Sequence, residues 1–363
     1  MNIPANRLDR LFYLHQQEYE NVALRVLRSG WYILGNEVSQ FEKEFADYVG
    51  SKYCIGLASG LDALWIAFRL LGIGRGDEII VQANAYIACI IGITMNNATP
   101  VFVEPDKYFT LDASKIESAI TDKTKAILVV HLYGQISDME AITAVAQTHN
   151  LYVVEDCAQS HGAKQNGKMS GTFGEVGCFS FYPSKNLGAF GDAGVVVTNS
   201  KKLADDFRIF RNYGSERRYY NKIVGTNSRL DEIQAALLRV RLKYLDCMNK
   251  ERAKICNYYL EKIKNKKIKL PEIRESCETV WHQFVVQVED RENFINYLQS
   301  KGIGSIIHYP IPPHLSEAYA YLGLKKGDFP LTEKYADMVL SLPLYNDMTK
   351  EEQDYVINMI NAY

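Results

Sequence analysis

The sequence predicts an α/β fold, with a large, mostly parallel seven-stranded sheet followed by a smaller α+β domain at the C-terminal end. Two observations support this prediction. Short runs rich in Val, Ile and aromatic residues, which are typical of strands, recur along the first half of the chain. Helical patterns lie between several of these runs, and such alternation favours a parallel sheet covered by helices on both faces.

The expected elements follow one another in a regular order. We expect strands at Tyr53–Leu57, Glu78–Val81, Pro100–Val103, Ala126–His131, Tyr152–Val154, Gly177–Phe181 and Gly194–Val197. We expect helices at Leu11–Leu27, Phe41–Tyr48, Asp62–Leu71, Ala88–Met95, Ala113–Ile120 and Met139–His149. The loop between the last two strands is too short for a crossover helix, so an antiparallel strand is expected there.

The pattern changes after Asn227, where the chain becomes helical and charged. Leu230–Tyr259 predicts one long helix or two consecutive ones, and Val280–Val288 predicts a strand, followed by a helix, a strand and a helix to the C-terminal end. We therefore place the large α/β domain at residues 1–245 and a small C-terminal domain at residues 246–363.

Composition and charge exclude several classes of protein. The chain has 41 basic and 43 acidic residues, so no basic excess points to nucleic acid or to an anionic membrane surface. No apolar run approaches the length of a signal peptide core near the N-terminus or of a membrane span elsewhere. The seven scattered cysteines have no CxxC spacing, which predicts reduced thiols in a cytoplasmic protein and no metal site.

Two charged residues follow predicted strands and are candidates for chemistry. Asp156 comes at the carboxyl end of an apolar strand, where ligands bind in open α/β sheets, although such residues often only cap the next helix. Lys185 follows another strand, flanked by apolar and aromatic residues that would desolvate its amine and lower its pKa. Such a lysine can form a Schiff base with an aldehyde. Pyridoxal phosphate needs this lysine and an acid at its ring nitrogen, which Asp156 can supply.

A candidate phosphate site lies earlier in the chain. Ser59, Gly60 and Leu61 follow a strand and open a helix, where free backbone N–H groups and the helix dipole favour an anion. Ser59 is equally suited to being only a helix cap. The glycine-rich segment Gly72–Gly76 runs from helix to strand, the wrong direction for a phosphate cradle, and predicts a turn.

Several motifs in order along nearly the whole chain resemble the DegT/DnrJ/EryC1/StrS family of sugar aminotransferases, which have an aspartate-aminotransferase-like, PLP-dependent transferase fold. The motifs are Ser29–Gly35, Ser59–Leu64, Pro100–Val103, His131–Gln135, Glu155–Ala163, Phe179–Gly188, Gly225–Glu232 and His308–His314. Two positions depart from the pattern, because Leu61 and Ala85 stand where many relatives carry Thr. At Leu61, a phosphate contact would then come from the backbone alone.

The resemblance implies roles for individual residues. Lys185 matches the Schiff-base lysine and the general acid/base, Asp156 the partner of the pyridine nitrogen, and Gln159 the neighbour of the ring hydroxyl. Tyr86 matches an aromatic residue stacked on the ring, whose alternative role is packing in the core. The implied phosphate ligands are Ser59, Gly60, Leu61, Ser180 and, reaching in from the partner subunit of a homodimer with shared active sites, Asn227. The implied substrate contacts are Tyr32, Tyr182, His308, Tyr309 and His314.

The implied reaction transfers an amino group from L-glutamate, through pyridoxal 5'-phosphate, to the ketone of a nucleotide-linked hexose. The run His131–Gln135 resembles members that aminate C3 of dTDP-3-keto-6-deoxyhexoses, with a C4 aminotransferase of a 4-keto sugar nucleotide as the alternative. A non-catalytic relative that binds only the cofactor or the sugar is a further alternative. A sugar dehydratase of this family would carry His at position 185, and no strand–GxGxxG–helix unit supports an NAD-binding protein.

Overall fold

A computed structural model describes all 363 residues of the chain. The chain begins with three helices, α1 (Leu8–Leu14), α2 (Gln16–Ser29) and α3 (Asn36–Val49). The single helix expected at Leu11–Leu27 is therefore interrupted, because His15 leaves the helical region at φ −134° and ψ 27°. The apolar periodicity continues across this break, so the pattern alone did not reveal it.

The centre of the molecule is a seven-stranded sheet in the order β1-β9-β8-β5-β4-β2-β3. The pairs among β2, β3, β4, β5 and β8 are parallel, whereas β9 pairs antiparallel with both β1 and β8. This confirms the mostly parallel sheet and its antiparallel strand. The bounds are β1 Tyr53–Leu57, β2 Glu78–Gln82, β3 Thr99–Val103, β4 Thr124–Val130, β5 Tyr152–Asp156, β8 Val176–Ser180 and β9 Gly194–Thr198.

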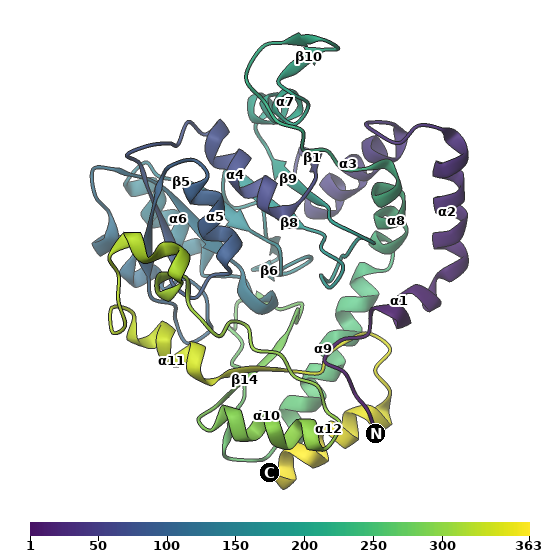
Figure 1. The fold of residues 1–363 in the computed structure, drawn as a ribbon, viewed down its shortest axis with the longest axis vertical. Helices are drawn as coiled ribbons and strands as arrows, with labels where there is room; N and C mark the ends of the chain where they lie inside the picture. Colours follow the sequence, from purple (N-terminus) through teal and green to yellow (C-terminus); the bar gives the residue numbers. More distant parts are fainter.

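Helices cover both faces of this sheet (Figure 1). Along β2, Ile79 and Val81 pack with α4 (Gly60–Leu70) and α5 (Ile87–Thr94), while Ile80 packs with α6 (Met139–Thr148) on the other face. This alternation follows from the two-residue period of a strand. The face beneath β1, β8 and β9 is covered by α3 and by α8 (Glu232–Leu242).

Two local predictions differ from the structure. The helix expected at Ala113–Ile120 is two short 3₁₀ turns, η1 (Ala113–Lys115) and η2 (Glu117–Ala119). Its apolar residues still face the core, since Ile116 is fully buried there. A helix that was not predicted, α7 (Lys201–Phe210), is capped by the Ser200 side chain and buries Phe207 and Phe210 against α4 and β1.

A second core lies in the C-terminal part. The long helical stretch after Asn227 resolves into α8 and α9 (Leu245–Lys262), and the strand expected from Val280 begins four residues later. The N-terminus joins this part, because Ile3 is fully buried in its core and bridges to Ile303. The other elements are β12 Ile268–Lys269, β14 Phe284–Val288, α10 Arg291–Ser300, η4 Pro313–Leu315, η5 Glu317–Leu322, α11 Pro330–Met338, β15 Val339–Leu342 and α12 Lys350–Ala362.

The two parts are joined by more than the chain passing between them. The strand β13 (Cys277–Glu278) of the C-terminal part pairs with β6 (Lys164–Gln165), which also pairs with β7 (Lys168–Met169). Arg274 forms an ion pair with Asp106 and stacks on Tyr108. The domain division at residue 245 stays a prediction.

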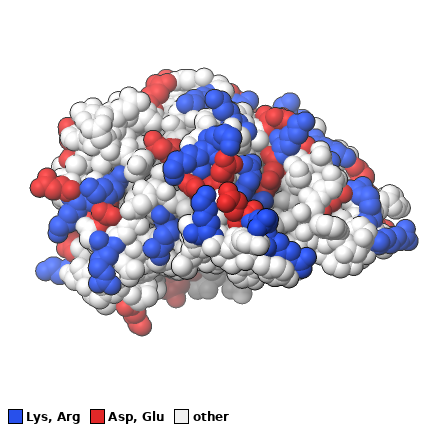
Figure 2. All heavy atoms as spheres, turned by 90° about the horizontal axis from the view of Figure 1, so that it is seen from above, with Lys and Arg blue, Asp and Glu red and all other residues white.

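A short hairpin extends beyond the sheet at the top of Figure 1, formed by β10 (Ser215–Arg217) and β11 (Tyr220–Asn221). Figure 2 views the molecule from this end, where basic and acidic side chains are interspersed. Part of this mixture is explained by the i,i+4 ion pairs Lys201–Asp205 and Lys202–Asp206 along α7. None of the helices is both long and apolar enough to cross a membrane.

Candidate active site

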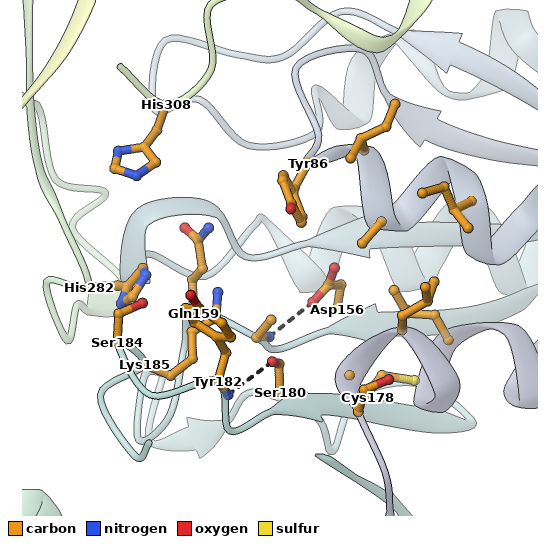
Figure 3. A pocket seen from close by; sticks show the side chains of 18 of the residues that line it. Tyr86, Asp156, Gln159, Cys178, Ser180, Tyr182, Ser184, Lys185, His282 and His308 are labelled. Atoms are coloured by element: carbon orange, nitrogen blue, oxygen red, sulfur yellow. Dashed lines mark hydrogen bonds between the residues drawn. The ribbon is translucent and has the colours of Figure 1, made fainter. Parts of the chain in front are cut away.

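A cavity of about 430 Å³ opens where several strands of the large sheet end, and the C-terminal part closes one side of it. Its walls bring together residues that are far apart in the sequence (Figure 3). Among the predicted site residues, those lining the cavity are Ser59, Gly60, Leu61, Tyr86, Asp156, Gln159, Ser180, Tyr182, Lys185, His308 and Tyr309.

One end of the cavity is built to receive an anion. At the start of α4 the Ser59 hydroxyl accepts the N–H of Asp62 at 3.1 Å, and the Ser59 carbonyl accepts the N–H of Ala63 at 3.2 Å. These bonds leave the preceding N–H groups, those of Gly60 and Leu61, directed along the helix axis towards the cavity. Ser180 lies against this turn and accepts the N–H of Tyr182 at 3.3 Å, so its hydroxyl hydrogen remains available to a ligand.

Tight packing fixes this end of the cavity. A Cβ on Gly60 would lie 2.5 Å from the Ser180 Cβ, and a Cβ on Gly194 would lie 2.4 Å from the carbonyl of Ser59. Only glycine permits these approaches, because any side chain would separate the three segments. The glycines therefore hold the serine hydroxyls and the helix N-terminus close together.

Asp156 ends β5 and presents its carboxylate to the middle of the cavity. The side chain is only 6% exposed. Oδ1 accepts the N–H of Ala158 at 2.9 Å, and Oδ2 accepts the thiol of Cys89 at 3.0 Å. Figure 3 shows Asp156 between Tyr86 on one side and Ser180 on the other. A carboxylate held in this way can pair with a cationic or N–H group of a ligand.

Lys185 lies in the loop after β8, with its backbone N–H bonded to the Tyr182 carbonyl at 2.8 Å. The next residue, Asn186, anchors the loop: its Nδ2 donates to Asn249 Oδ1 and to the Val280 carbonyl, both at 2.9 Å. Burial lowers the pKa of the Lys185 amine, and the carboxylate of Asp156 partly offsets this effect. The amine is therefore shifted towards its neutral, nucleophilic form.

Gln159 is held by both parts of the chain. Its Oε1 accepts the N–H of Tyr133 at 2.7 Å, which fixes the orientation of the amide. Its Nε2 donates to the Tyr309 hydroxyl at 3.1 Å. The ring of Tyr309 lies 4.9 Å from that of Tyr86, so these aromatic residues form one wall. The second amide hydrogen of Gln159 is left for a ligand.

Histidines near the cavity are kept neutral. Burial, and next the charge of Lys185, lower the pKa of His308 to about 4 and that of His161 to about 3. The same causes lower the pKa of His282 well below its ordinary value. His308 contacts Ser341 Oγ through Nδ1 at 2.8 Å and Gln283 Nε2 through Nε2 at 2.9 Å. At neutral pH these three rings are therefore uncharged, and those of His282 and His308 form hydrogen bonds.

Three predicted residues lie outside the cavity. Tyr32 is 51% exposed and donates its hydroxyl to the Leu27 carbonyl. Asn227 is exposed and bridges to Asn212 near the base of the hairpin. His314 is only 1% exposed and contacts Glu333, away from the cavity wall. Within one chain the structure therefore does not bring these three residues to the site, and their roles stay predictions.

Other lining residues were missed from the sequence. Four polar residues that line the cavity are not predicted from the sequence: Ser184, Asp192, His282 and Gln283. Ser184 and Asp192 lie in the same glycine-rich loop as Lys185, so their proximity to it was a usable signal. His282 and Gln283 precede a strand of the C-terminal part, and no local pattern distinguishes them from other polar residues before a strand.

A buried hydrogen-bond network supports the strand that carries Asp156. Glu155 Oε1 accepts the N–H groups of Phe173 and Gly174 at 2.7 and 2.8 Å, and its Oε2 accepts that of Gly171 at 2.7 Å. His131 Nε2 donates to Oε2 at 3.0 Å. Glu155, His131 and Cys157 lie close enough to suggest metal ligands, but the oxygens of Glu155 are already hydrogen-bonded. The group is explained as a structural support.

Comparison with known proteins agrees with this geometry. A model of the DegT/DnrJ/EryC1/StrS aminotransferase family matches residues 14–361. The chain is 51% identical over 362 residues, 99% of both chains, to a dTDP-3-amino-3,6-dideoxy-alpha-D-galactopyranose transaminase from Aneurinibacillus thermoaerophilus. The fold and the cavity thus define a transaminase scaffold, and the chain belongs to the DegT/DnrJ/EryC1/StrS aminotransferase family.

Solved structures give the same result. DesV from S. venezuelae, solved in complex with a ketimine intermediate, has a TM-score of 0.98 and 43% identity, covering 99% of this chain and 98% of that one. NtdA from Bacillus subtilis, solved with bound cofactor PMP, has a TM-score of 0.92 and 34% identity, covering 99% and 84%. The fold is therefore that of PLP-dependent aminotransferases of this family.

Proposed function

We propose that this enzyme transfers an amino group from L-glutamate to the C3 ketone of a dTDP-linked 3-keto-6-deoxyhexose, with pyridoxal 5'-phosphate as cofactor. The observation that carries the proposal is the arrangement of one cavity, which contains a lysine of lowered pKa, a buried carboxylate and an anion cradle. These are the groups that pyridoxal phosphate requires at its aldehyde, its ring nitrogen and its phosphate.

The residues present fit this cofactor. The cradle of Ser59, Gly60 and Ser180 suits a phosphate, because it combines backbone N–H groups with hydroxyl donors. Asp156 would hold the ring nitrogen and Gln159 the ring hydroxyl, with Tyr86 beside the ring face. When bound, pyridoxal phosphate supplies an aldehyde for an amine and a ring that withdraws electrons from the reacting carbon.

The chain's own groups then perform defined tasks. The carboxylate of Asp156 would accept a charge-assisted hydrogen bond from a protonated ring nitrogen of the cofactor. Lys185, whose amine is shifted towards its neutral form by burial, would accept the proton from the α-carbon of glutamate and later deliver one to the sugar carbon that receives the amino group. The 3.0 Å and 2.9 Å bonds to Asp156 keep its carboxylate fixed while this happens.

The sugar is the part of the proposal that rests on relatives. The names of similar proteins include dTDP-3-amino sugar transaminases at 51% and 44% identity, which favours C3 over C4. Tyr182 is 56% exposed at the mouth of the cavity, and His308 faces the same space. The Tyr182 hydroxyl suits the hydroxyls of a sugar, whereas both ring nitrogens of His308 already hydrogen-bond to Ser341 and Gln283.

We also propose a homodimer with shared sites. The hairpin arm, residues 212–225, carries exposed apolar groups, with Tyr219 81% and Val224 94% exposed. Asn227 lies at the base of this arm and is exposed. A second copy packed here would cover the arm and receive Asn227 at its phosphate cradle.

The function is tested by product analysis. Purified protein is incubated with pyridoxal phosphate, L-glutamate and either a 3-keto or a 4-keto dTDP-6-deoxyhexose, and products are identified by mass spectrometry and NMR. We expect amination of the 3-keto sugar, with one 2-oxoglutarate released for each amino sugar formed. Amination of the 4-keto sugar alone would contradict the regiochemistry, and no amination of either sugar would contradict the proposed function.

A further inference from the structure

The carboxylate of Asp156 is held from two directions. Ala158, in the loop after β5, donates its backbone N–H to Oδ1 at 2.9 Å. Cys89, on a different element, donates its thiol to Oδ2 at 3.0 Å. A carboxylate has about four lone-pair sites, so two remain for the cavity. With a donor on each oxygen, the carboxylate cannot rotate without breaking a hydrogen bond.

Cys89 is buried behind Asp156 and does not line the cavity. It lies in the first turn of α5, where its backbone N–H bonds the Tyr86 carbonyl at 3.0 Å. One helical turn therefore places the Tyr86 ring in the cavity and the Cys89 thiol against Asp156. This arrangement fixes the distance between the aromatic wall and the carboxylate.

The thiol is protonated and is the donor of this hydrogen bond. Burial, followed by the charge of Asp156, raises the pKa of the Cys89 thiol well above its ordinary value. Burial raises the pKa of Cys178, also at the cavity, in the same direction. Of these two thiols, only that of Cys89 is within hydrogen-bond distance of the Asp156 carboxylate, at 3.0 Å.

We propose that Cys89 is a positioning residue that acts through Asp156, holding the carboxylate oriented towards the ring nitrogen of the cofactor. The proposal rests on the function proposed above and adds a residue that touches neither substrate nor cofactor. Because an S–H group is a weak donor, it orients the carboxylate while leaving most of its acceptor strength to the ligand.

The test is the affinity of the full-length apo-protein for pyridoxal phosphate, measured by titration. Cys89→Ala removes the donor, and Cys89→Val removes it while filling the space, so both should weaken binding about tenfold. Cys89→Ser keeps a donor and should bind within about twofold of the wild type. Cys256→Ala, which removes a buried thiol from the other core, is the control and should bind like the wild type.

A double-mutant cycle separates positioning from packing. In an Asp156→Ala background, Cys89→Ala should not weaken binding further, because no carboxylate remains to be oriented. Equal weakening in both backgrounds would overturn the proposal, as would wild-type affinity in folded Ala and Val variants. A wild type that binds no pyridoxal phosphate would instead overturn the proposed function.

Discussion

Replacing Gly60 with Ala tests the anion cradle directly. The new Cβ would lie 2.5 Å from the Cβ of Ser180 and 3.0 Å from its Cα, whereas ordinary contact begins at 3.4 Å. The helix start and β8 must therefore separate by about 1 Å to accommodate one methyl group. Such a shift acts on both stability and cofactor binding, because the same two segments carry the phosphate donors.

The expected change in stability follows from comparing the gain in helix propensity with the cost of overpacking. Alanine in place of glycine favours a helix by at most about 1 kcal/mol, whereas overpacking costs about 1–3 kcal/mol. We therefore expect a net decrease in the free energy of unfolding. Moving the donors by about 1 Å weakens one or two hydrogen bonds to a charged group, which lowers affinity for pyridoxal phosphate by about 10- to 100-fold.

The assay combines thermal unfolding of the apo-protein with titration of pyridoxal phosphate. Gly74→Ala is the matched control, because a Cβ there meets nothing closer than the Asn96 carbonyl at 3.8 Å. The control should keep wild-type affinity. If Gly60→Ala binds pyridoxal phosphate as tightly as the wild type, the cradle is not where the phosphate lies.

Three further changes have expected outcomes. Lys185→Ala should abolish transamination in a product assay and leave the circular dichroism spectrum unchanged; retained turnover would remove the lysine from its role. Glu232→Ala should lower the free energy of unfolding by about 2–4 kcal/mol in urea, because its carboxylate accepts three N–H groups at the start of α3; a change below about 0.5 kcal/mol would refute this. Burial lowers the pKa of His161 from 6.5 to about 3 in the folded protein. As the pH falls through 6.5, the unfolded chain therefore binds a proton at His161 while the folded protein does not, and this favours unfolding. Stability should therefore fall by up to about 2 kcal/mol between pH 7 and pH 5, and His161→Phe should reduce that slope; an unchanged slope would contradict the buried neutral ring.

Most strands and helices of the large domain could be predicted from the local pattern of apolar and polar residues. All seven sheet strands were placed within a few residues, because buried strands of a parallel sheet are continuous apolar runs. The errors came where local sequence is ambiguous. The break at His15 interrupts a continuing helical period, and the segment Ala113–Ile120 is too short for its period to distinguish 3₁₀ turns from a helix.

The site was predictable where residues sit at strand ends. Asp156 ends a strand, Lys185 and the Ser59 turn each follow one, and a parallel sheet brings strand ends to one edge. His282 and Gln283 come from the C-terminal part, and their place in the wall depends on how the two parts pack. The contact between Cys89 and Asp156 could not be predicted either. A cysteine inside an apolar helix gives the same sequence pattern whether it packs in the core or hydrogen-bonds a carboxylate.

The most direct measurement of the central claim is the site of covalent attachment of the cofactor. Purified protein is saturated with pyridoxal phosphate, reduced with borohydride, digested and analysed by mass spectrometry. We predict a single phosphopyridoxyl group on the peptide that contains Lys185, and its absence after prior incubation with L-glutamate. Attachment at another lysine, or none at all, would contradict the assignment of this cavity as a transaminase active site.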